Sequence, residues 1–177
     1  RSRRLAGFSA LALALASAGV GGARQFAAAL GPLDLAKTQE GSPLVSDRDG
    51  RLLRPFTTAD GRWKLPVSVA EVDPGYIALL KAYEDQRFDR HGGVDLRAAA
   101  RALWQMVRHG RVVSGGSTLT MQVARLLEPR EERSLAAKAR QVVRAGQLEA
   151  MANKAAILDH YLTLAPYGGN IEGVRAA

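Results

Sequence analysis

Cysteine is absent from this chain of 177 residues, and histidine occurs only three times. Without cysteine the protein can form neither a disulfide bond nor a zinc site with thiolate ligands. The histidine best placed for chemistry, His91, has no second His or Cys at metal-ligand spacing. The sequence therefore predicts no metal-binding residues.

Acidic residues are fewer than basic ones: the chain has 17 Asp and Glu and 25 Lys and Arg, which gives a formal net charge of +8. A basic excess favours polyanionic partners, namely nucleic acid, anionic lipid head groups or a substrate that carries pyrophosphate. Charge alone does not choose among the three. The length and the 47% hydrophobic content are those of one folded domain with a real core.

Charged residues are also missing from one stretch near the N-terminus. Arg1, Arg3 and Arg4 precede an uncharged run from Leu5 to Ala23. Its length of about 19 residues is close to what a helix needs to cross a bilayer. The arginines place the start of such a helix on the cytoplasmic side. The run predicts a single-pass anchor; a cleaved signal peptide, with Ala16-Ser17-Ala18 as its cleavage site, stays the alternative.

Three regions are expected along the chain. Residues 1–28 hold the anchor or signal peptide, residues 29–68 form an extended or hairpin-like connector, and residues 69–177 form the folded domain. Turn residues at Asp47-Arg48-Asp49-Gly50 and at Asp60-Gly61 separate the short apolar stretches of the connector.

The region after the connector has the signals of helices, so the fold is predicted to be mainly α. N-capping residues open each helix, and Gly110 is expected to end the second. The helices are expected at Asp73–Tyr83, at Asp95–His109, from Ser117 or Thr118, from Ser134, and from Asn153. One apolar stripe of the second helix contains Leu96, Ala99, Ala100, Leu103 and Val107. The buried face of the last contains Ile157, Leu158, Tyr161 and Leu162.

The segment from Glu84 to Asp95 places acids, bases and glycines between two predicted helices, a composition typical of functional loops. Glu84 follows Ile77 by seven residues and Leu80 by four, so its carboxylate is expected beside apolar groups at a helix end. Such a carboxylate suits a general base. An acid at a frayed helix end with salt-bridged neighbours is the alternative. For His91 the alternative is a structural role beside the glycine turn.

The segment from Ser114 to Arg125 is a glycine-containing turn that runs into a helix, where free backbone N–H groups can hold an anion. On that helix Thr118, Gln122 and Arg125 share a polar face, opposite an apolar face of Leu119, Val123 and Leu126. The polar face belongs either to an ordinary surface helix or to a phosphate site. A nucleotide-binding P-loop is excluded, because its Gly-Lys-Ser/Thr ending is missing.

The fourth predicted helix carries Lys138, Gln141, Ala145 and Glu149 along one stripe. This stripe is either the continuation of a cationic groove or a solvated basic face.

Taken together and in this order, these segments resemble the glycosyltransferase domain of class A penicillin-binding proteins, most nearly the penicillin-binding protein 1C branch. A Glu-Asp-x-x-Phe-x-x-His-x-Gly-x-Asp motif is matched from Glu84 to Asp95, and a Gly-Gly-Ser-Thr-Leu-Thr-x-Gln motif from Gly115 to Gln122. The third motif is matched by Lys138, Ala145 and Glu149, and the fourth by Lys154, Ile157-Leu158, Tyr161-Leu162 and Tyr167-Gly168-Gly169. The resemblance begins near Val45.

The resemblance implies a lysozyme-like, mainly helical domain that polymerises lipid II into glycan strands, with inversion at MurNAc C1 and release of undecaprenyl pyrophosphate. Glu84 is the implied catalytic base. The implied substrate-binding residues are Asp85, Phe88, His91, Ser117, Thr118, Gln122, Arg125, Lys138 and Gln141. The implied location is the bacterial inner membrane, with one membrane pass and the catalytic domain in the periplasm.

Two positions depart from the family's pattern. Gln141 stands where most members have a second functional Glu, and Gln at this position is typical of the 1C branch. Thr163 stands where Asn is usual. No resident cofactor is implied. A divalent cation, Mg2+ or Mn2+, held by substrate phosphates and few protein oxygens, is the open alternative.

Lipid II, the growing glycan strand and membrane lipid are the implied partners, and other cell-wall synthesis proteins could join them. Nucleic acid is not expected, because the basic residues are spread over several helices. A lysozyme-like glycan hydrolase and a non-catalytic scaffold that binds precursor remain as alternatives. Family members continue with further helices after the fourth motif, so one interpretation is that the chain is a fragment of a longer synthase.

Overall fold

The computed structural model describes residues 21–22, 24–111, 115–129 and 134–177. It divides the chain into two compact units, Arg1–Leu33 and Asp34–Ala177. Most of the uncharged N-terminal run, the arginines before it, the Ala16-Ser17-Ala18 site and Ser114 lie outside the described residues, so anchor and signal peptide both stay predictions. Among the helices that are described, none is long and apolar enough to cross a membrane.

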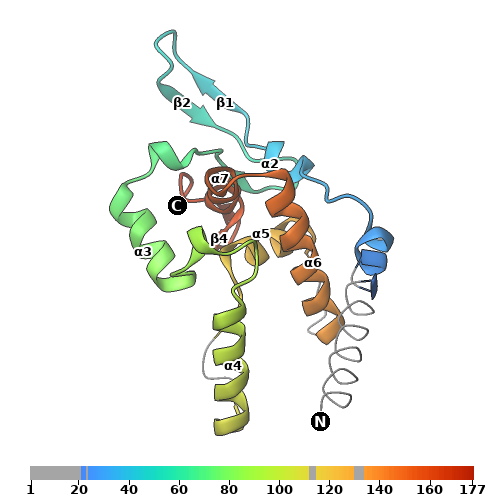
Figure 1. Cartoon of the computed structure of the whole chain (residues 1–177). Coiled ribbons are helices and arrows are strands. Elements are labelled where there is room, and N and C mark those ends of the chain that lie inside the picture. Colours follow the sequence, from blue (N-terminus) through green and yellow to red (C-terminus); the bar gives the residue numbers. More distant parts are fainter. Residues whose placement is uncertain (1–20, 23, 112–114, 130–133) are drawn as a thin grey trace, which may run out of the picture. The chain divides into compact units, whose positions relative to one another are not determined.

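The unit Asp34–Ala177 is mainly helical, as predicted (Figure 1). Its helices are α2 (Ala36–Gln39), α3 (Pro74–Glu84), α4 (Leu96–His109), α5 (Leu119–Leu127), α6 (Leu135–Met151) and α7 (Lys154–Leu164). Two 3-10 turns, η1 (Val69–Glu71) and η2 (Phe88–Arg90), flank α3. The predicted N-caps of α3 to α7 are confirmed, since a side-chain oxygen of each accepts a backbone N–H of the first turn: Asp73, Asp95, Thr118, Ser134 and Asn153.

Short strands make up the rest of the regular secondary structure in the described part of this unit. Strands β1 (Leu44–Ser46) and β2 (Leu52–Pro55) form an antiparallel hairpin around the predicted turn at Asp47–Gly50. Strand β3 (Trp63–Lys64) runs parallel to β5 (Ile171–Glu172), which pairs antiparallel with β4 (Pro166–Gly168). The connector therefore contributes a strand to a sheet whose other strands come from the C-terminal end.

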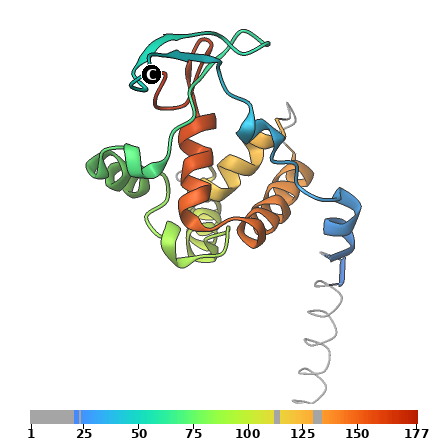
Figure 2. The ribbon, with the colours of Figure 1, turned by 90° about the horizontal axis from the view of Figure 1, so that it is seen from above.

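The core of this unit lies where α5 packs against α6 and α7 (Figure 2). Its fully buried apolar side chains come from these three helices and from η2: Phe88, Leu119, Met121, Val123, Leu148, Ile157 and Leu162. Burying each of them stabilises the fold by roughly 1.5–3 kcal/mol relative to exposure. This packing fixes the N-terminus of α5, against which the loop after α3 docks.

Helix α4, like α3 before it, has no buried residue, in contrast to α5, which follows it. It projects away from the other helices of its unit (Figure 1). Gly116 lies close to its N-terminal half, at Ala99 and Ala102. The large residues of the apolar stripe that predicts this helix, Leu96, Leu103 and Val107, are exposed, whereas Ala99 is half-buried.

Candidate active site

Glu84 is the last residue of α3, and its side chain is exposed. The side-chain amide of Gln122, on α5, donates a hydrogen bond to Glu84 Oε2 at 2.8 Å. The predicted apolar neighbours Ile77 and Leu80 are half-buried on the same helix, and their contact with this carboxylate stays a prediction. Because α3 ends at Glu84, the carboxylate extends toward the polar face of α5.

A cavity of about 220 Å³ opens beside Glu84. It is lined by Glu84, Ser117, Met121, Gln122, Arg125 and Gln141. Lys138 reaches the same place from α6, where its Nζ donates to Ser117 Oγ at 2.6 Å and to Gln141 Oε1 at 3.4 Å. The structure thus brings six of the predicted site residues together, and we call this cavity the Arg125 pocket.

Positive charge accumulates in the Arg125 pocket. Burial lowers the pKa of Lys138, and the nearby Arg125 guanidinium lowers it further. Within the described residues, neither cation forms an ion pair with a carboxylate. Two neighbouring cations without a protein anion favour the binding of an external anion.

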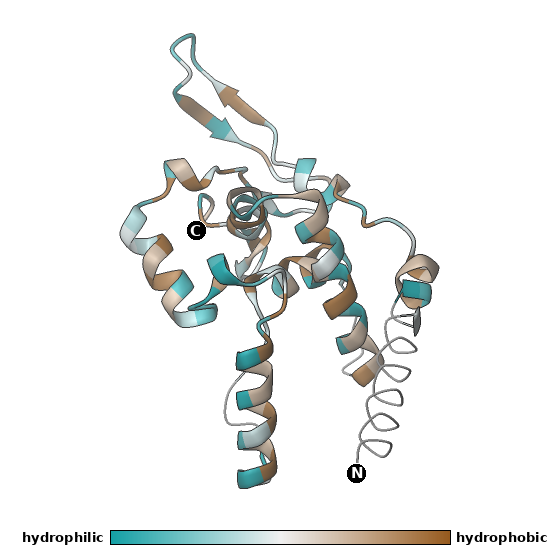
Figure 3. Cartoon of the chain, in the orientation of Figure 1, coloured by the Kyte–Doolittle hydropathy of each residue, from teal (hydrophilic) through white to brown (hydrophobic). Residues whose placement is uncertain are grey.

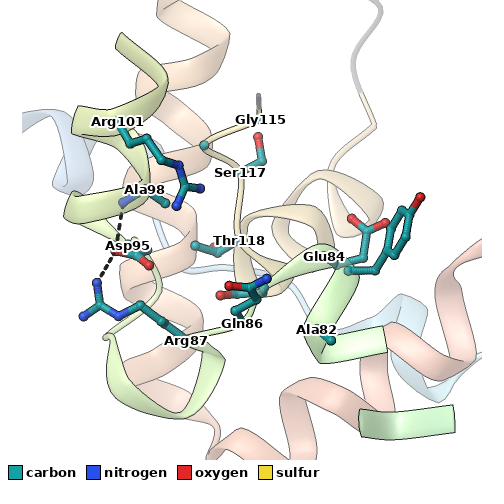
Figure 4. A pocket seen from close by; sticks show the side chains of 13 residues that line it. Ala82, Glu84, Gln86, Arg87, Asp95, Ala98, Arg101, Gly115, Ser117 and Thr118 are labelled. Carbon is teal, nitrogen blue, oxygen red and sulfur yellow. Dashed lines mark hydrogen bonds and ion pairs between the residues drawn. The ribbon is translucent and has the colours of Figure 1, made fainter. Parts of the chain in front are cut away.

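A second cavity, of about 350 Å³, lies on the other side of the glycine turn. Arg101 of α4 and Glu84 lie at opposite sides of it, and Ser117 lies at its rim (Figure 4). We call it the Arg101 pocket; Glu84 and Ser117 line both pockets. Sequence reasoning missed Arg101. The helical spacing could have indicated this residue, because it places Arg101 on the side of α4 opposite to Leu96 and Leu103.

Asp95 anchors one wall of the Arg101 pocket. Burial acts to raise its pKa, but the backbone N–H groups of Ala98 and Arg97 and the charge of Arg87 outweigh this, so the net pKa is lowered. Arg87 Nη1 lies 3.1 Å from Asp95 Oδ1 (Figure 4). The carboxylate is therefore ionised and fully occupied with holding the start of α4.

Asp85 points into the interior, although it is next to the exposed Glu84. Its Oδ2 accepts the backbone N–H of Leu119 at 3.0 Å, and His91 Nε2 lies 2.9 Å from its Oδ1. One buried carboxylate thereby connects the loop after α3 to the first turn of α5. This arrangement matches the structural alternative for His91.

Thr118 and Phe88 are also interior side chains. Thr118 Oγ1 donates to Gly93 O at 2.5 Å and accepts the backbone N–H of Met121, so both hydrogen-bonding capacities serve the fold. The ring of Phe88 is 1% exposed and lies 4.5 Å from Lys154 Nζ. Substrate contact by Asp85, Phe88, His91 and Thr118 stays a prediction; in the structure they contact other protein groups.

Gly93 lets the same loop approach α6. Its φ of +89° lies in the region that favours glycine, and a Cβ there would lie 2.9 Å from Ala145 O. The glycine of the first motif is therefore required by packing.

The Glu149 side chain links three helices below the site. Its Oε1 accepts hydrogen bonds from Thr120 Oγ1 of α5 at 2.7 Å and from Lys154 Nζ of α7 at 2.5 Å. Lys154 Nζ also donates to His91 O at 2.7 Å. The third and fourth motifs thus meet the first through one half-buried network.

Tyrosines from α3, α7 and β4 gather near Glu84. The hydroxyls of Tyr76 and Tyr167 are hydrogen-bonded to each other. Burial raises the pKa of Tyr161, and the charge of Glu84 raises it further. Burial and the hydrogen bond to Tyr76 likewise raise the pKa of Tyr167. The raised pKa keeps Tyr161 and Tyr167 neutral near pH 7, and a neutral phenol can donate a hydrogen bond to a sugar hydroxyl.

Oxygen ligands for a divalent cation are sparse here. Among the described residues, no cluster of three acids or histidines is suited to a metal ion. The Arg125 pocket offers one carboxylate, from Glu84, beside the amides of Gln122 and Gln141. A cation at this site would take most of its ligands from a substrate.

Comparisons with known proteins show which family this chain resembles. The transglycosylase family profile matches residues 49–177. Penicillin-binding protein 1C of Escherichia coli (strain K12) is 47% identical over 148 residues, which cover 84% of this chain and 19% of that protein. Penicillin-binding protein 1A of Pseudomonas aeruginosa is 33% identical over 75% of this chain and 16% of that protein. The chain thus spans less than a fifth of the length of these two relatives.

A shorter relative carries the same match. The biosynthetic peptidoglycan transglycosylase of Thiobacillus denitrificans is 40% identical over 96 residues, 54% of this chain and 41% of that protein. The resemblance drawn from the four motifs is confirmed, and the chain belongs to the transglycosylase family found in the penicillin-binding proteins of class A.

Proposed function

We propose that this chain is a peptidoglycan glycosyltransferase that polymerises lipid II into glycan strands. The observation that carries the proposal is a single exposed carboxylate, Glu84, between two pockets that each contain an arginine. Family membership and the name of the T. denitrificans relative support the same reaction class. A reaction that joins two lipid pyrophosphates needs this combination of base and cations.

Glu84 acts as the general base in this proposal. It accepts the proton of the acceptor's GlcNAc 4-hydroxyl, whose oxygen attacks C1 of the donor's MurNAc from the face opposite the leaving group. The C1–O bond to undecaprenyl pyrophosphate breaks, and its electron pair leaves with the pyrophosphate, so C1 is inverted. The hydrogen bond from Gln122 fixes the direction of the Glu84 carboxylate.

Arg125 and Lys138 stabilise the departing pyrophosphate. Both cations lie by the Arg125 pocket, neither forms an ion pair with a carboxylate of the described residues, and Lys138 Nζ donates to Ser117 Oγ at 2.6 Å. The negative charge of the leaving group grows as the C1–O bond breaks, so fixed cations stabilise the transition state more than the ground state. Gln141 supplies an amide where most members have Glu, which leaves the pocket more positive.

Asp85, Phe88, His91 and Thr118 act as positioning residues in addition to their predicted contact with substrate, and Asp85 and Thr118 also line the Arg101 pocket. Their polar atoms bond to Leu119 N, Gly93 O and each other, and these bonds hold Glu84 in register with Gln122. A base displaced by one ångström from its acceptor loses much of its effect.

The remaining expectations belong to the same proposal. The helical domain is lysozyme-like, residues 1–28 anchor it in the inner membrane or serve as a signal peptide, and residues 29–68 connect the anchor to the domain at 69–177 in the periplasm. Membrane lipid and cell-wall synthesis proteins are further partners. Mg2+ or Mn2+, if used, arrives with the pyrophosphate.

The decisive test is incubation of the purified full chain with lipid II, with polymer read on a gel and undecaprenyl pyrophosphate by chromatography. Loss of lipid II with equal release of pyrophospholipid supports the proposal. A glycan hydrolase would leave lipid II intact and shorten preformed glycan strands. A scaffold would bind lipid II and change neither; either result would sink the proposal.

A further inference from the structure

Tyr83 is an exposed aromatic residue beside the proposed base. It is the last residue but one of α3 and is 88% exposed. A single exposed aromatic ring is ordinary on a protein surface, but this one lines the Arg101 pocket together with Glu84. Because consecutive Cα atoms are about 3.8 Å apart, a molecule bound at the Glu84 carboxylate in this pocket is within reach of the Tyr83 ring.

The other walls of the Arg101 pocket carry hydrogen-bonding groups. Gln86 and Arg101, both exposed, are among the side chains that line it (Figure 4). Ser117 adds a hydroxyl group, and Gly115 leaves open space where a Cβ would lie. A pocket of about 350 Å³ with an aromatic ring and several polar groups suits a ligand that is apolar on one face and polar at its edge.

A sugar ring has this distribution of polarity. In a β-linked GlcNAc unit the axial C–H groups at C1, C3 and C5 make one face of the ring apolar, whereas hydroxyl and acetamido groups project from its edge. Aromatic rings pack against such a face, and amide and guanidinium groups form hydrogen bonds with the edge. A lipid surface or a flat protein partner would instead need a continuous apolar patch without polar walls.

We propose that Tyr83 is a specificity-determining residue that packs against the acceptor's GlcNAc ring in the Arg101 pocket, and that Gln86 binds the edge of the same sugar. This inference rests on the proposed function, in which Glu84 takes the proton of that sugar's 4-hydroxyl. Arg125 and Lys138 there hold the donor's pyrophosphate, so the acceptor lies on the Arg101 side of Glu84. A ring held flat on Tyr83 presents its 4-hydroxyl to the base in one orientation.

The test isolates the acceptor side by filling the donor side first. The full chain is saturated with the phosphoglycolipid moenomycin, a mimic of the donor strand, and fluorescent lipid II is titrated by anisotropy. Tyr83→Ala should weaken the binding of lipid II about tenfold, because the aromatic face is lost. Tyr83→Phe should bind like the parent. Gln86→Leu should weaken binding about threefold, because one neutral hydrogen bond is lost. The affinity for moenomycin itself should stay unchanged in all three variants.

Leu79→Ala is the matched control. Leu79 lies one turn before Tyr83 on α3, where hydrophobic and hydrophilic residues are mixed (Figure 3). It is 65% exposed and lines neither the Arg101 pocket nor the Arg125 pocket. Leu79→Ala should therefore bind lipid II like the parent, and thermal melts of both alanine variants should coincide with it. If Leu79→Ala loses as much affinity as Tyr83→Ala, the exposed side of α3 contacts the lipid tail and the assignment to a sugar is wrong.

Two further results would overturn the proposal. Tyr83→Ala that binds lipid II like the parent, or a moenomycin-saturated parent that binds no lipid II, would mean that Tyr83 faces no acceptor sugar. Polymer formation by the parent chain without moenomycin tests the proposed function separately. If the parent forms no polymer but its binding of lipid II depends on Tyr83, the reaction is wrong and the sugar contact stands.

Discussion

In two pairs of consecutive residues, one side chain lies at the open site and its neighbour lies in the interior. Glu84 is exposed at the Arg125 pocket, while Asp85 is buried against the first turn of α5. Ser117 lines both pockets, while Thr118 caps α5 and donates to Gly93 O. A motif that reads as one functional unit thus contains two kinds of residue. One kind is free to meet a ligand, and its neighbour has already used its hydrogen bonds on the fold.

The largest effect on activity is expected at the exposed member of the first pair. Glu84→Gln keeps the shape and can keep a hydrogen bond with Gln122, but an amide cannot accept the proton. We expect polymerisation to fall roughly 10²–10⁴-fold with an unchanged melting temperature. Rates come from the lipid II gel assay and melting from circular dichroism. A loss below about tenfold contradicts the role of general base.

Arg125 should act on the ligand and not on the fold. Arg125→Ala should weaken the binding of moenomycin, a phosphoglycolipid that mimics the donor strand in this family, by roughly 1.5–3 kcal/mol. Arg125→Lys should recover part of the loss, because a point charge remains. Titration of the three proteins alongside thermal melts checks this. If affinity falls only together with the melting temperature, Arg125 is structural.

The buried member of the first pair should show the reverse pattern. Asp85→Asn places an NH2 group against the donors Leu119 N–H or His91 Nε2, so we expect about 2 kcal/mol less stability toward urea. Any loss of activity should then shrink when conditions stabilise the fold. Full stability with abolished activity would assign Asp85 to the chemistry and remove the contrast with Glu84.

The second pair allows a smaller comparison within one turn. Thr118→Val removes the N-cap of α5 and should lower stability by about 1 kcal/mol. Ser117→Ala should leave stability within error and raise the KM for lipid II, because the hydroxyl held by Lys138 is lost. Equal unfolding midpoints for the two variants would argue against a role of Thr118 in the fold and of Ser117 in substrate binding.

The smallest expected effect is a pH dependence outside the site. Burial lowers the pKa of His160, although Asp159 opposes the shift. As the pH falls below about 6.5, the unfolded chain binds this proton before the folded chain does, so stability decreases until the pH passes the lowered folded pKa. His160→Gln should flatten the dependence of the unfolding free energy on pH in this window. An identical slope in both proteins would show that His160 titrates normally.

The sequence was most informative where side chains act on their own backbone. Asp73, Asp95 and Asn153 cap helices at the predicted residues, and Gly110 ends α4 with a φ of +63°. Such signals are local, since the cap and the N–H groups it accepts lie within a few residues. The polar face with Gln122 and Arg125 was predicted for the same reason, because helical periodicity fixes which side chains are neighbours.

Contacts between distant segments were not predictable in this way. Nothing local indicates that Asp85 would accept from Leu119 N, or that Trp63 would pair with Ile171 across the whole domain. Periodicity also identifies an apolar face without saying what covers it, and α4 and α5 show both outcomes: Val123 is buried and Val107 is 75% exposed. Arg101 was missed because its partner surface, the glycine turn, comes from another part of the chain.

Because Gly93 has no side chain, its backbone can lie directly against helix α6. The loop that begins at Glu84 touches α6 here, and Ala145 O leaves no room for a methyl group. Gln141 and Lys138 lie one and two turns from Ala145 on the same helix. A methyl group at Gly93 would therefore act as a wedge that moves the base away from the cations. The width of the site is set at a residue that no substrate needs to touch.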